Sequence, residues 1–92
     1  MVAGPEQRIQ TRILRELKKR GIYAVKIITA SRNGVPDILC CYRGRFIGIE
    51  VKTPKGRLSA AQDFHLKLID KAGGVAVIAR SWEDVFNALN IE

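Results

Sequence analysis

The strongest constraint in this sequence is a pair of apolar segments separated by a very short polar turn. Residues 37–42 and 46–53 consist mainly of apolar residues, and Arg43-Gly44-Arg45 lies between them. A turn of this length with a glycine, which tolerates a positive φ angle, is typical of a β-hairpin. The two segments are therefore expected to be neighbouring antiparallel strands.

Helical and extended patterns alternate in the rest of the chain. A helix is expected over residues 5–20, because it begins with a proline and Gly21 suits its end. Its apolar face would carry Ile9, Ile13 and Leu17, which recur at spacings of four. The other expected elements are strands at residues 23–28 and 75–79, and helices that Ser59 and Ser81 cap and that end near residues 72 and 90.

These elements occur in the order α-β-β-β-α-β-α. The hairpin strands are antiparallel and the fourth strand follows a crossover helix, so we expect a mixed four-stranded sheet flanked by helices. A length of 92 residues suffices for one domain with one modest core. We therefore predict a single α/β domain over residues 1–92.

Composition narrows the class of protein. No apolar run approaches the roughly 18 residues that a membrane span needs, and the charged N-terminal segment does not resemble a secretory signal. We therefore expect an intracellular, cytoplasmic protein. Cys40 and Cys41 are strand neighbours that point to opposite faces, which disfavours a disulfide. With one histidine, the chain also lacks ligands for a Cys/His zinc site.

The formal net charge of +7 suits a polyanionic partner such as nucleic acid, because each neutralised phosphate releases counterions. Basic residues are expected in a stripe on the first helix and in a cluster around the central strands. A solvated helix face explains the stripe equally well. The stripe consists of Arg8, Arg12, Arg15 and Lys19, and the cluster of Arg43, Arg45, Lys55 and Arg57. The candidate nucleic-acid contacts are Arg8, Arg12, Lys55 and Arg57.

Two charges interrupt the second hairpin strand. Residues 47, 49 and 51 are aliphatic and would face the core, whereas Glu50 and Lys52 share the other face, about 6.6–6.8 Å apart along the strand. A carboxylate and an ammonium group within a strand are costly if they are buried without partners. We therefore expect these two side chains to have a partner or a function.

Asp37 would supply a second carboxylate. Counting across the turn sets Asp37 opposite Glu50, and paired strands lie about 4.8 Å apart. A divalent cation removes the repulsion between two carboxylates, and oxygen ligands alone favour Mg²⁺ or Mn²⁺ over zinc. Such an ion would bind a phosphate oxygen and lower the pKa of a bound water, while Lys52 orients the water or the phosphate.

Two further polar residues have competing explanations. Glu6 lies on the apolar stripe of the first helix and is expected to face a polar group inside, although the helix dipole also favours an acid there. Gln62 follows Ser59 by three residues, a capping-box spacing that explains it without chemistry. We interpret His65 as structural, and the aromatic residues Tyr42, Phe46, Phe64 and Trp82 as core.

The runs Gly34-Val35-Pro36-Asp37 and Ile49-Glu50-Val51-Lys52 resemble the PD-(D/E)XK nuclease pattern. Their spacing, the run Gly56-Arg57-Leu58-Ser59 with Gln62, and Glu6 on the first helix are similar to the VRR-NUC branch, over nearly the whole chain. The resemblance implies a restriction-endonuclease-like fold and metal-dependent phosphodiester hydrolysis. Small stand-alone members resemble phage and viral enzymes, some of which act as dimers on branched DNA.

The resemblance also implies a role for each matching residue. Asp37, Glu50 and the backbone carbonyl of Val51 would be metal ligands, Lys52 the catalytic lysine, and Glu6 and Gln62 supporting residues. We therefore expect a Mg²⁺- or Mn²⁺-dependent DNA endonuclease, specific for branched or Holliday-junction DNA, that acts as a homodimer without a small-molecule cofactor. The alternatives are a non-catalytic nucleic-acid-binding module that retains the fold, and a small structural protein of a ribonucleoprotein.

Overall fold

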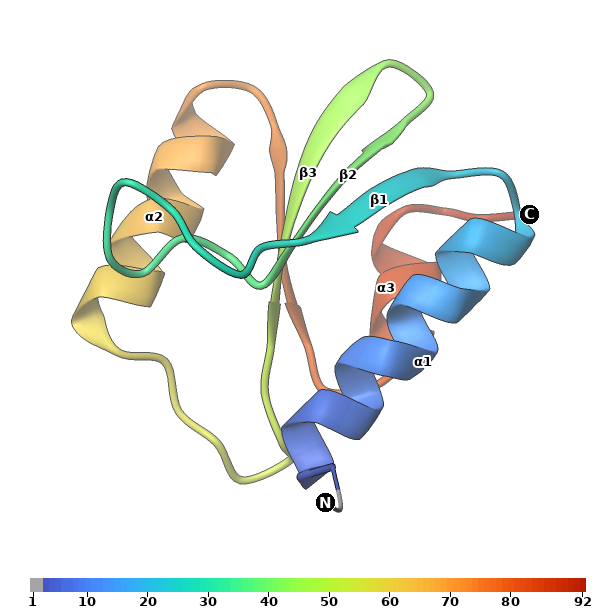
Figure 1. The fold of residues 1–92 in the computed structure, drawn as a ribbon. Coiled ribbons are helices and arrows are strands. Elements are labelled where there is room, and N and C mark those ends of the chain that lie inside the picture. Colours follow the sequence, from blue (N-terminus) through green and yellow to red (C-terminus); the bar gives the residue numbers. More distant parts are fainter. Residues whose placement is uncertain (1–2) are drawn as a thin grey trace.

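A computed structural model describes residues 3–92, and each predicted helix and strand is present in it (Figure 1). The order αβββαβα and the mixed four-stranded sheet are as predicted. None of the described helices has both the length and the apolar character needed to cross a membrane. The elements are α1 (Pro5–Lys19), β1 (Tyr23–Lys26), β2 (Ile38–Tyr42), β3 (Arg45–Val51), α2 (Ala60–Lys71), β4 (Val75–Ala79) and α3 (Trp82–Ala88).

The four strands lie side by side in chain order. β2 is antiparallel to both of its neighbours, β1 and β3, and β4 pairs with β3 in parallel after the α2 crossover. The hairpin turn consists of Arg43 and Gly44 alone, since Tyr42 already pairs with Arg45. Both turn residues have positive φ angles, 53° and 76°, which is the turn geometry that matches the twist of paired strands.

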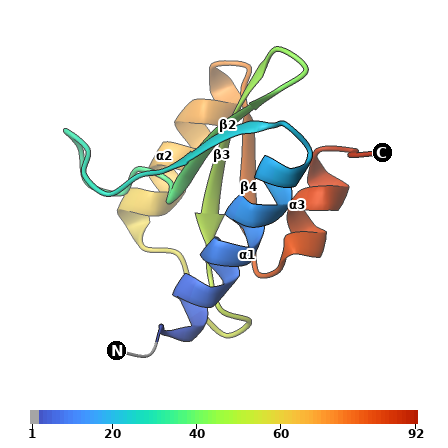
Figure 2. The same ribbon diagram turned by 45° about the vertical axis from the view of Figure 1, so that its right-hand side comes forward.

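Helices cover both faces of the sheet, with α1 and α3 on one face and α2 on the other (Figures 1 and 2). The main core lies beneath α1 and α3. There the aliphatic face of β3, represented by Ile49, packs with Ile13 and Leu17 of α1 and with Trp82 and Val85 of α3. Glu50 neighbours Ile49 on β3, so its side chain points to the opposite face of the sheet, on the side of α2.

On the other face of the sheet, Ile69 of α2 and Pro36 pack over Gly48. A Cβ atom on Gly48 would lie 2.6 Å from Ile69 Cδ1 and 3.1 Å from Pro36 Cγ, so a larger residue would require these side chains to shift. Side chains alternate along a strand, and Glu50 is the next residue of β3 on this face. The glycine therefore leaves room for both side chains next to Glu50.

The ends of two strands differ from the prediction. β1 ends at Lys26, and beyond it Ile27 keeps one hydrogen bond, from its N–H to the Asp37 carbonyl at 2.8 Å, before the chain leaves the sheet. β3 ends at Val51, after which Lys52 donates its N–H to the Ala79 carbonyl at 3.0 Å. Both strands end earlier than predicted because their pairing with a neighbouring strand stops there, and sequence patterns do not show where a partner strand ends.

Two other expectations are wrong in part. Arg43 and Arg45 lie at the hairpin end of β3, whereas Lys55 and Arg57 follow its other end, so a seven-residue strand separates them by roughly 20 Å and they form no single cluster. Among the aromatic residues, Trp82 is buried and Tyr42 packs against the core. Phe46 and Phe64, in contrast, are each 51% exposed.

Candidate active site

Glu50 is buried on the α2 side of the sheet, with only 1% of its surface exposed. Neither of its carboxylate oxygens has a hydrogen-bond partner among the described residues. Burial raises the pKa of Glu50 from its ordinary value of 4.5 to about 8, and the neighbouring carboxyl group of Asp37 adds to the increase. Such an isolated acid is costly to bury in its ionised form, so it needs a nearby cation.

Asp37 lies directly before β2 and reaches across to β3. The register pairs Ile38 with Ile49, which makes Asp37 and Glu50 neighbours on adjoining strands. Asp37 Oδ2 accepts a hydrogen bond from the Val51 N–H at 2.8 Å. This bond holds the Asp37 carboxylate in one orientation beside Glu50, and it places the backbone of Val51 at the same point.

Lys52 brings the one cation of this group. Its Nζ lies 4.0 Å from Glu50 Oε2, and its side chain is 12% exposed. The ammonium group lowers the pKa of Glu50, but burial and Asp37 outweigh it. Lys52 Nζ thus lies beside the carboxylate pair with a small part of its side chain open to solvent.

The two supporting residues are placed differently. Glu6 is half-buried in the first turn of α1, and its charge makes the smallest contribution to the raised pKa of Glu50. Gln62 forms the predicted capping box with Ser59: its Oε1 accepts from the Ser59 N–H at 2.9 Å, while its own N–H donates to Ser59 Oγ at 3.1 Å. Capping thus accounts for the position of the Gln62 side chain.

The chemistry of these residues fits a divalent cation. Within residues 3–92, no three acidic, histidine or cysteine side chains converge on one point, so the carboxylate ligands would be Asp37 and Glu50 alone. Their oxygens are the hard donors that Mg²⁺ and Mn²⁺ prefer. The unpaired oxygens of Glu50 are the observation that matters most, since a cation would satisfy them and restore the ionised form.

Arg80 is a residue that sequence patterns did not single out. Its guanidinium Nη1 donates to the carbonyls of Thr53 at 2.6 Å and Gly56 at 2.8 Å, across the loop that follows β3. Its backbone N–H donates to Asp84 Oδ2 at 2.8 Å, which fixes the arginine at the start of α3. Arg80 therefore holds the backbone directly after Lys52. A lone arginine after an apolar strand gives no signal of such a role.

Gln10 is a second residue that the sequence did not reveal. It lies one turn after Glu6 on the same face of α1, is 7% exposed, and its Oε1 has no hydrogen-bond partner among the described residues. The spacing of four from Glu6 was the available signal, because it places two polar residues on the buried face of one helix.

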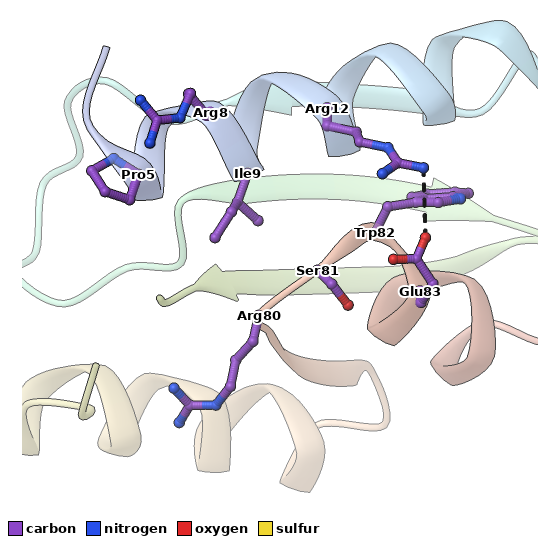
Figure 3. Close-up of a pocket in the computed structure, with 8 residues that line it drawn as sticks. All are labelled: Pro5, Arg8, Ile9, Arg12, Arg80, Ser81, Trp82 and Glu83. Carbon is purple, nitrogen blue, oxygen red and sulfur yellow. Dashed lines mark ion pairs between the residues drawn. The ribbon is translucent and has the colours of Figure 1, made fainter. Parts of the chain in front are cut away.

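The basic stripe of α1 borders a hollow of about 340 Å³ between this helix and the start of α3 (Figure 3). Arg12 Nη2 lies 3.6 Å from Glu83 Oε2 across the hollow, and both side chains are more than half exposed. An exposed pair of this kind contributes little to stability, so Arg12 can exchange its partner for a phosphate at small cost. The hollow is lined by Pro5, Arg8, Ile9, Arg12, Arg80, Ser81, Trp82 and Glu83.

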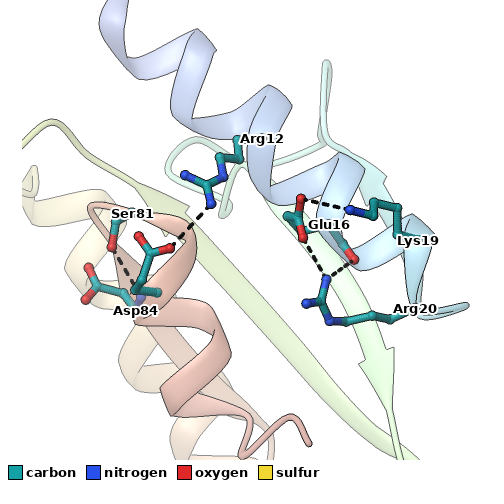
Figure 4. Close-up of polar contacts among 7 residues, drawn as sticks. Arg12, Glu16, Lys19, Arg20, Ser81 and Asp84 are labelled. Atoms are coloured by element: carbon teal, nitrogen blue, oxygen red, sulfur yellow. Dashed lines mark hydrogen bonds and ion pairs between the residues drawn. The ribbon is translucent and has the colours of Figure 1, made fainter.

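Further along α1, the stripe is engaged with an acid of the same helix (Figure 4). Glu16 lies 2.8 Å from Arg20 and 3.7 Å from Lys19, and the hydrogen bond from Arg20 holds the pKa of Glu16 below its ordinary range. The end of the stripe near the site, at Arg8, instead bonds to the Ala3 carbonyl at 2.9 Å. Arg8, the candidate nucleic-acid contact nearest Glu6, is thus bonded to a backbone carbonyl and not to an acid.

Comparisons with known proteins identify the family and the fold. A family model described as the VRR-NUC domain matches residues 7–83. No curated protein sequence matches the chain. A solved structure titled VRR_NUC domain has a TM-score of 0.82 and 23% identity, over 97% of this chain and 98% of its own. Another, titled VRR_NUC domain protein, has a TM-score of 0.79 and 19% identity, over 98% and 88%.

A third similar structure is Hjc of Archaeoglobus fulgidus, described as a Holliday junction resolvase from an archaeal hyperthermophile. It has a TM-score of 0.60 and is 29% identical, over 79% of this chain and 65% of its own. The likeness identifies the present fold as restriction-endonuclease-like.

Proposed function

The chain belongs to the VRR-NUC domain family, a branch of a nuclease superfamily, and on this premise we propose that it is a metal-dependent endonuclease acting on branched DNA. One observation supports the metal dependence most strongly. Glu50 is buried beside a second carboxylate, and within residues 3–92 neither of its oxygens accepts a hydrogen bond, so its ionised form would gain from a bound cation in addition to the ammonium of Lys52 at 4.0 Å.

In this proposal Asp37, Glu50 and the carbonyl of Val51 hold Mg²⁺ or Mn²⁺. When bound, the cation supplies a Lewis acid and a water of lowered pKa. Asp37 is kept in orientation by its hydrogen bond from the Val51 N–H. Lys52 binds a phosphate oxygen through Nζ and offsets the charge that develops there during hydrolysis.

Other residues support this arrangement. Glu6 and Gln62 support the site from the first turns of α1 and α2. Gln62 does so by forming the cap with Ser59 that begins α2. Arg8, Arg12, Lys55 and Arg57 contact the phosphate backbone, and all four are exposed. A second copy of the chain, related by a twofold axis, would place two such sites on one junction and allow both strands to be cut.

The experiment is a cleavage panel over single-stranded, duplex, flap and four-way-junction DNA, each with Mn²⁺, with Mg²⁺ and with a chelator. We expect cleavage only with metal and fastest on branched DNA. Cleavage should be abolished by each of three substitutions: Asp37→Asn, Glu50→Gln and Lys52→Met. Their effects on the rate should not add when they are combined, since all three residues act on one phosphate. Asp70→Asn, an exposed acid on α2, is the matched control and should cleave like the parent.

Two outcomes would contradict the proposal. Full activity in Asp37→Asn would show that the carboxylate pair is not the site. Tight, salt-dependent DNA binding with no cleavage under any metal would instead favour the non-catalytic binding module.

A further inference from the structure

The segment between β1 and β2, residues 27–36, projects from the body of the domain (Figure 2). It carries Ile28, whose side chain is 88% exposed. Single exposed apolar residues are common on protein surfaces, but the position of this one is specific. The preceding residue, Ile27, donates its N–H to the carbonyl of Asp37 at 2.8 Å. Ile28 therefore stands one residue from a backbone bond to the proposed metal ligand.

A second exposed apolar side chain faces the same segment from α2. Phe64 is 51% exposed, and the guanidinium carbon of Arg32 lies 5.8 Å from the centre of its ring. His65 packs edge-on against the same ring, with ring centres 5.9 Å apart. An exposed ring with an arginine beside it is the combination that proteins use to stack unpaired bases.

Residues 27–36 are held against α2 at their far end. Gly34 has a φ angle of +88°, and a Cβ atom there would lie 2.6 Å from the backbone carbon of Ala61. Pro36 packs at Gly48 on the sheet. Both contacts fix the end of the segment that leads into Asp37, while the bond from Ile27 to the Asp37 carbonyl fixes its start.

The charge of the segment indicates the kind of partner. Residues 26–36 include Lys26 and Arg32 and no acidic residue. A second copy of this surface would be repelled, whereas nucleic acid supplies both phosphates for the cations and ring faces for the apolar side chains. Intact duplex DNA hides its ring faces in the stack, and only a branch or distortion exposes them.

We propose that residues 27–36 and Phe64 form a base-contact surface that binds unstacked bases of branched DNA beside the phosphate that is cut. The proposal rests on the function proposed above and deepens it, because it names the surface that distinguishes a branch from linear duplex. Ile28 inserts at the step that the branch opens, and Phe64 with Arg32 stacks on the released base.

The test compares cleavage of a four-way junction and of linear duplex by Ile28→Ser, Phe64→Leu and the parent. Phe46→Leu is the matched control, since Phe46 is equally exposed but lies on the hairpin strand. We expect the junction-to-duplex rate ratio to fall roughly tenfold in Ile28→Ser and Phe64→Leu, which corresponds to about 1.4 kcal/mol. The duplex rate should stay within about twofold, and Phe46→Leu should retain the parental ratio.

A binding measurement separates this surface from catalysis. A junction with 2-aminopurine at the branch should brighten when the parent binds it in chelator, because unstacking relieves quenching, and should brighten much less with Ile28→Ser or Phe64→Leu. This readout decides the proposal even if the parent cleaves nothing. Equal brightening by the parent and both variants, or equal loss of junction and duplex cleavage, would overturn it. A fall in molecular mass of Phe64→Leu by light scattering, with loss of both activities, would assign Phe64 to a contact between copies instead.

Discussion

Replacement of Glu50 by glutamine should remove a pH dependence that the metal-free protein carries. The pKa of Glu50 is about 8 in the folded chain, because of burial and then Asp37, against an ordinary value of 4.5. Between these values the folded state holds a proton that the unfolded state has released. The stabilising contribution is thus complete below about pH 4.5 and is lost as pH rises through 8.

The magnitude follows from linkage. A difference of one bound proton changes the free energy of unfolding by about 1.4 kcal/mol per pH unit. Between pH 5 and pH 8 the parent should therefore lose about 4 kcal/mol relative to Glu50→Gln, which does not titrate. Urea unfolding at each pH unit in chelator measures this difference, and subtraction cancels the other titrating groups. Asp70→Asn should follow the parent.

The reasoning would be refuted if the free energy of unfolding changed with pH in the same way for the parent and Glu50→Gln. It would also be refuted if the parent gained stability relative to the variant between pH 5 and pH 8. Addition of Mn²⁺ at pH 7 gives an independent check on the same carboxylate. At ten times its dissociation constant, the ion should stabilise the parent by about 1.4 kcal/mol and Glu50→Gln by much less.

Substitutions at four other positions have defined outcomes. Asp37→Asn retains an oxygen for the Val51 N–H, so metal-free unfolding in urea should show stability equal to or above the parent, whereas a marked loss would indicate a structural cap. Arg80→Ala should cost about 2–4 kcal/mol in the same assay and slow junction cleavage, and Arg80→Lys should recover only part of both. Gln10→Leu should leave stability unchanged or raised by thermal melt, since it removes an unpaired buried oxygen. Arg57→Ala should lower the slope of log affinity against log salt by about 1, measured by fluorescence anisotropy.

The fold was predictable because its signals are local. The hairpin follows from a glycine-containing turn between two apolar runs, and the α2 cap follows from Ser59 and Gln62 at capping-box spacing. The end of β1 lies earlier than predicted because its pairing with β2 stops at Lys26, and no local pattern encodes where that pairing ends.

The carboxylate pair was predictable for a related reason. A hairpin with a short turn fixes its register, so counting from Arg43 and Gly44 suffices to place Asp37 beside Glu50. The burial of Glu50 was not given by counting. It depends on tertiary packing over the sheet, such as that of Ile69 and Pro36 over Gly48, which joins distant parts of the chain.

The remaining features depend on tertiary contacts alone. Arg80 meets the loop after β3 from a position 24 to 27 residues further along the chain, and no local periodicity records this. Phe64 was expected in the core because aromatic residues usually lie there. Its exposure arises because α2 turns that side away from the sheet, and the same exposure leaves the ring free to meet a base.

The most direct test of the central claim is the rate of four-way-junction cleavage as a function of Mn²⁺ concentration, for the parent and for Asp37→Asn at equal protein concentration. If the carboxylate pair holds the catalytic ion, the parental rate will rise from zero in chelator and saturate, while Asp37→Asn will stay at background across the titration. Cleavage by the parent in chelator, or saturation of Asp37→Asn at the parental rate and concentration, would contradict the account.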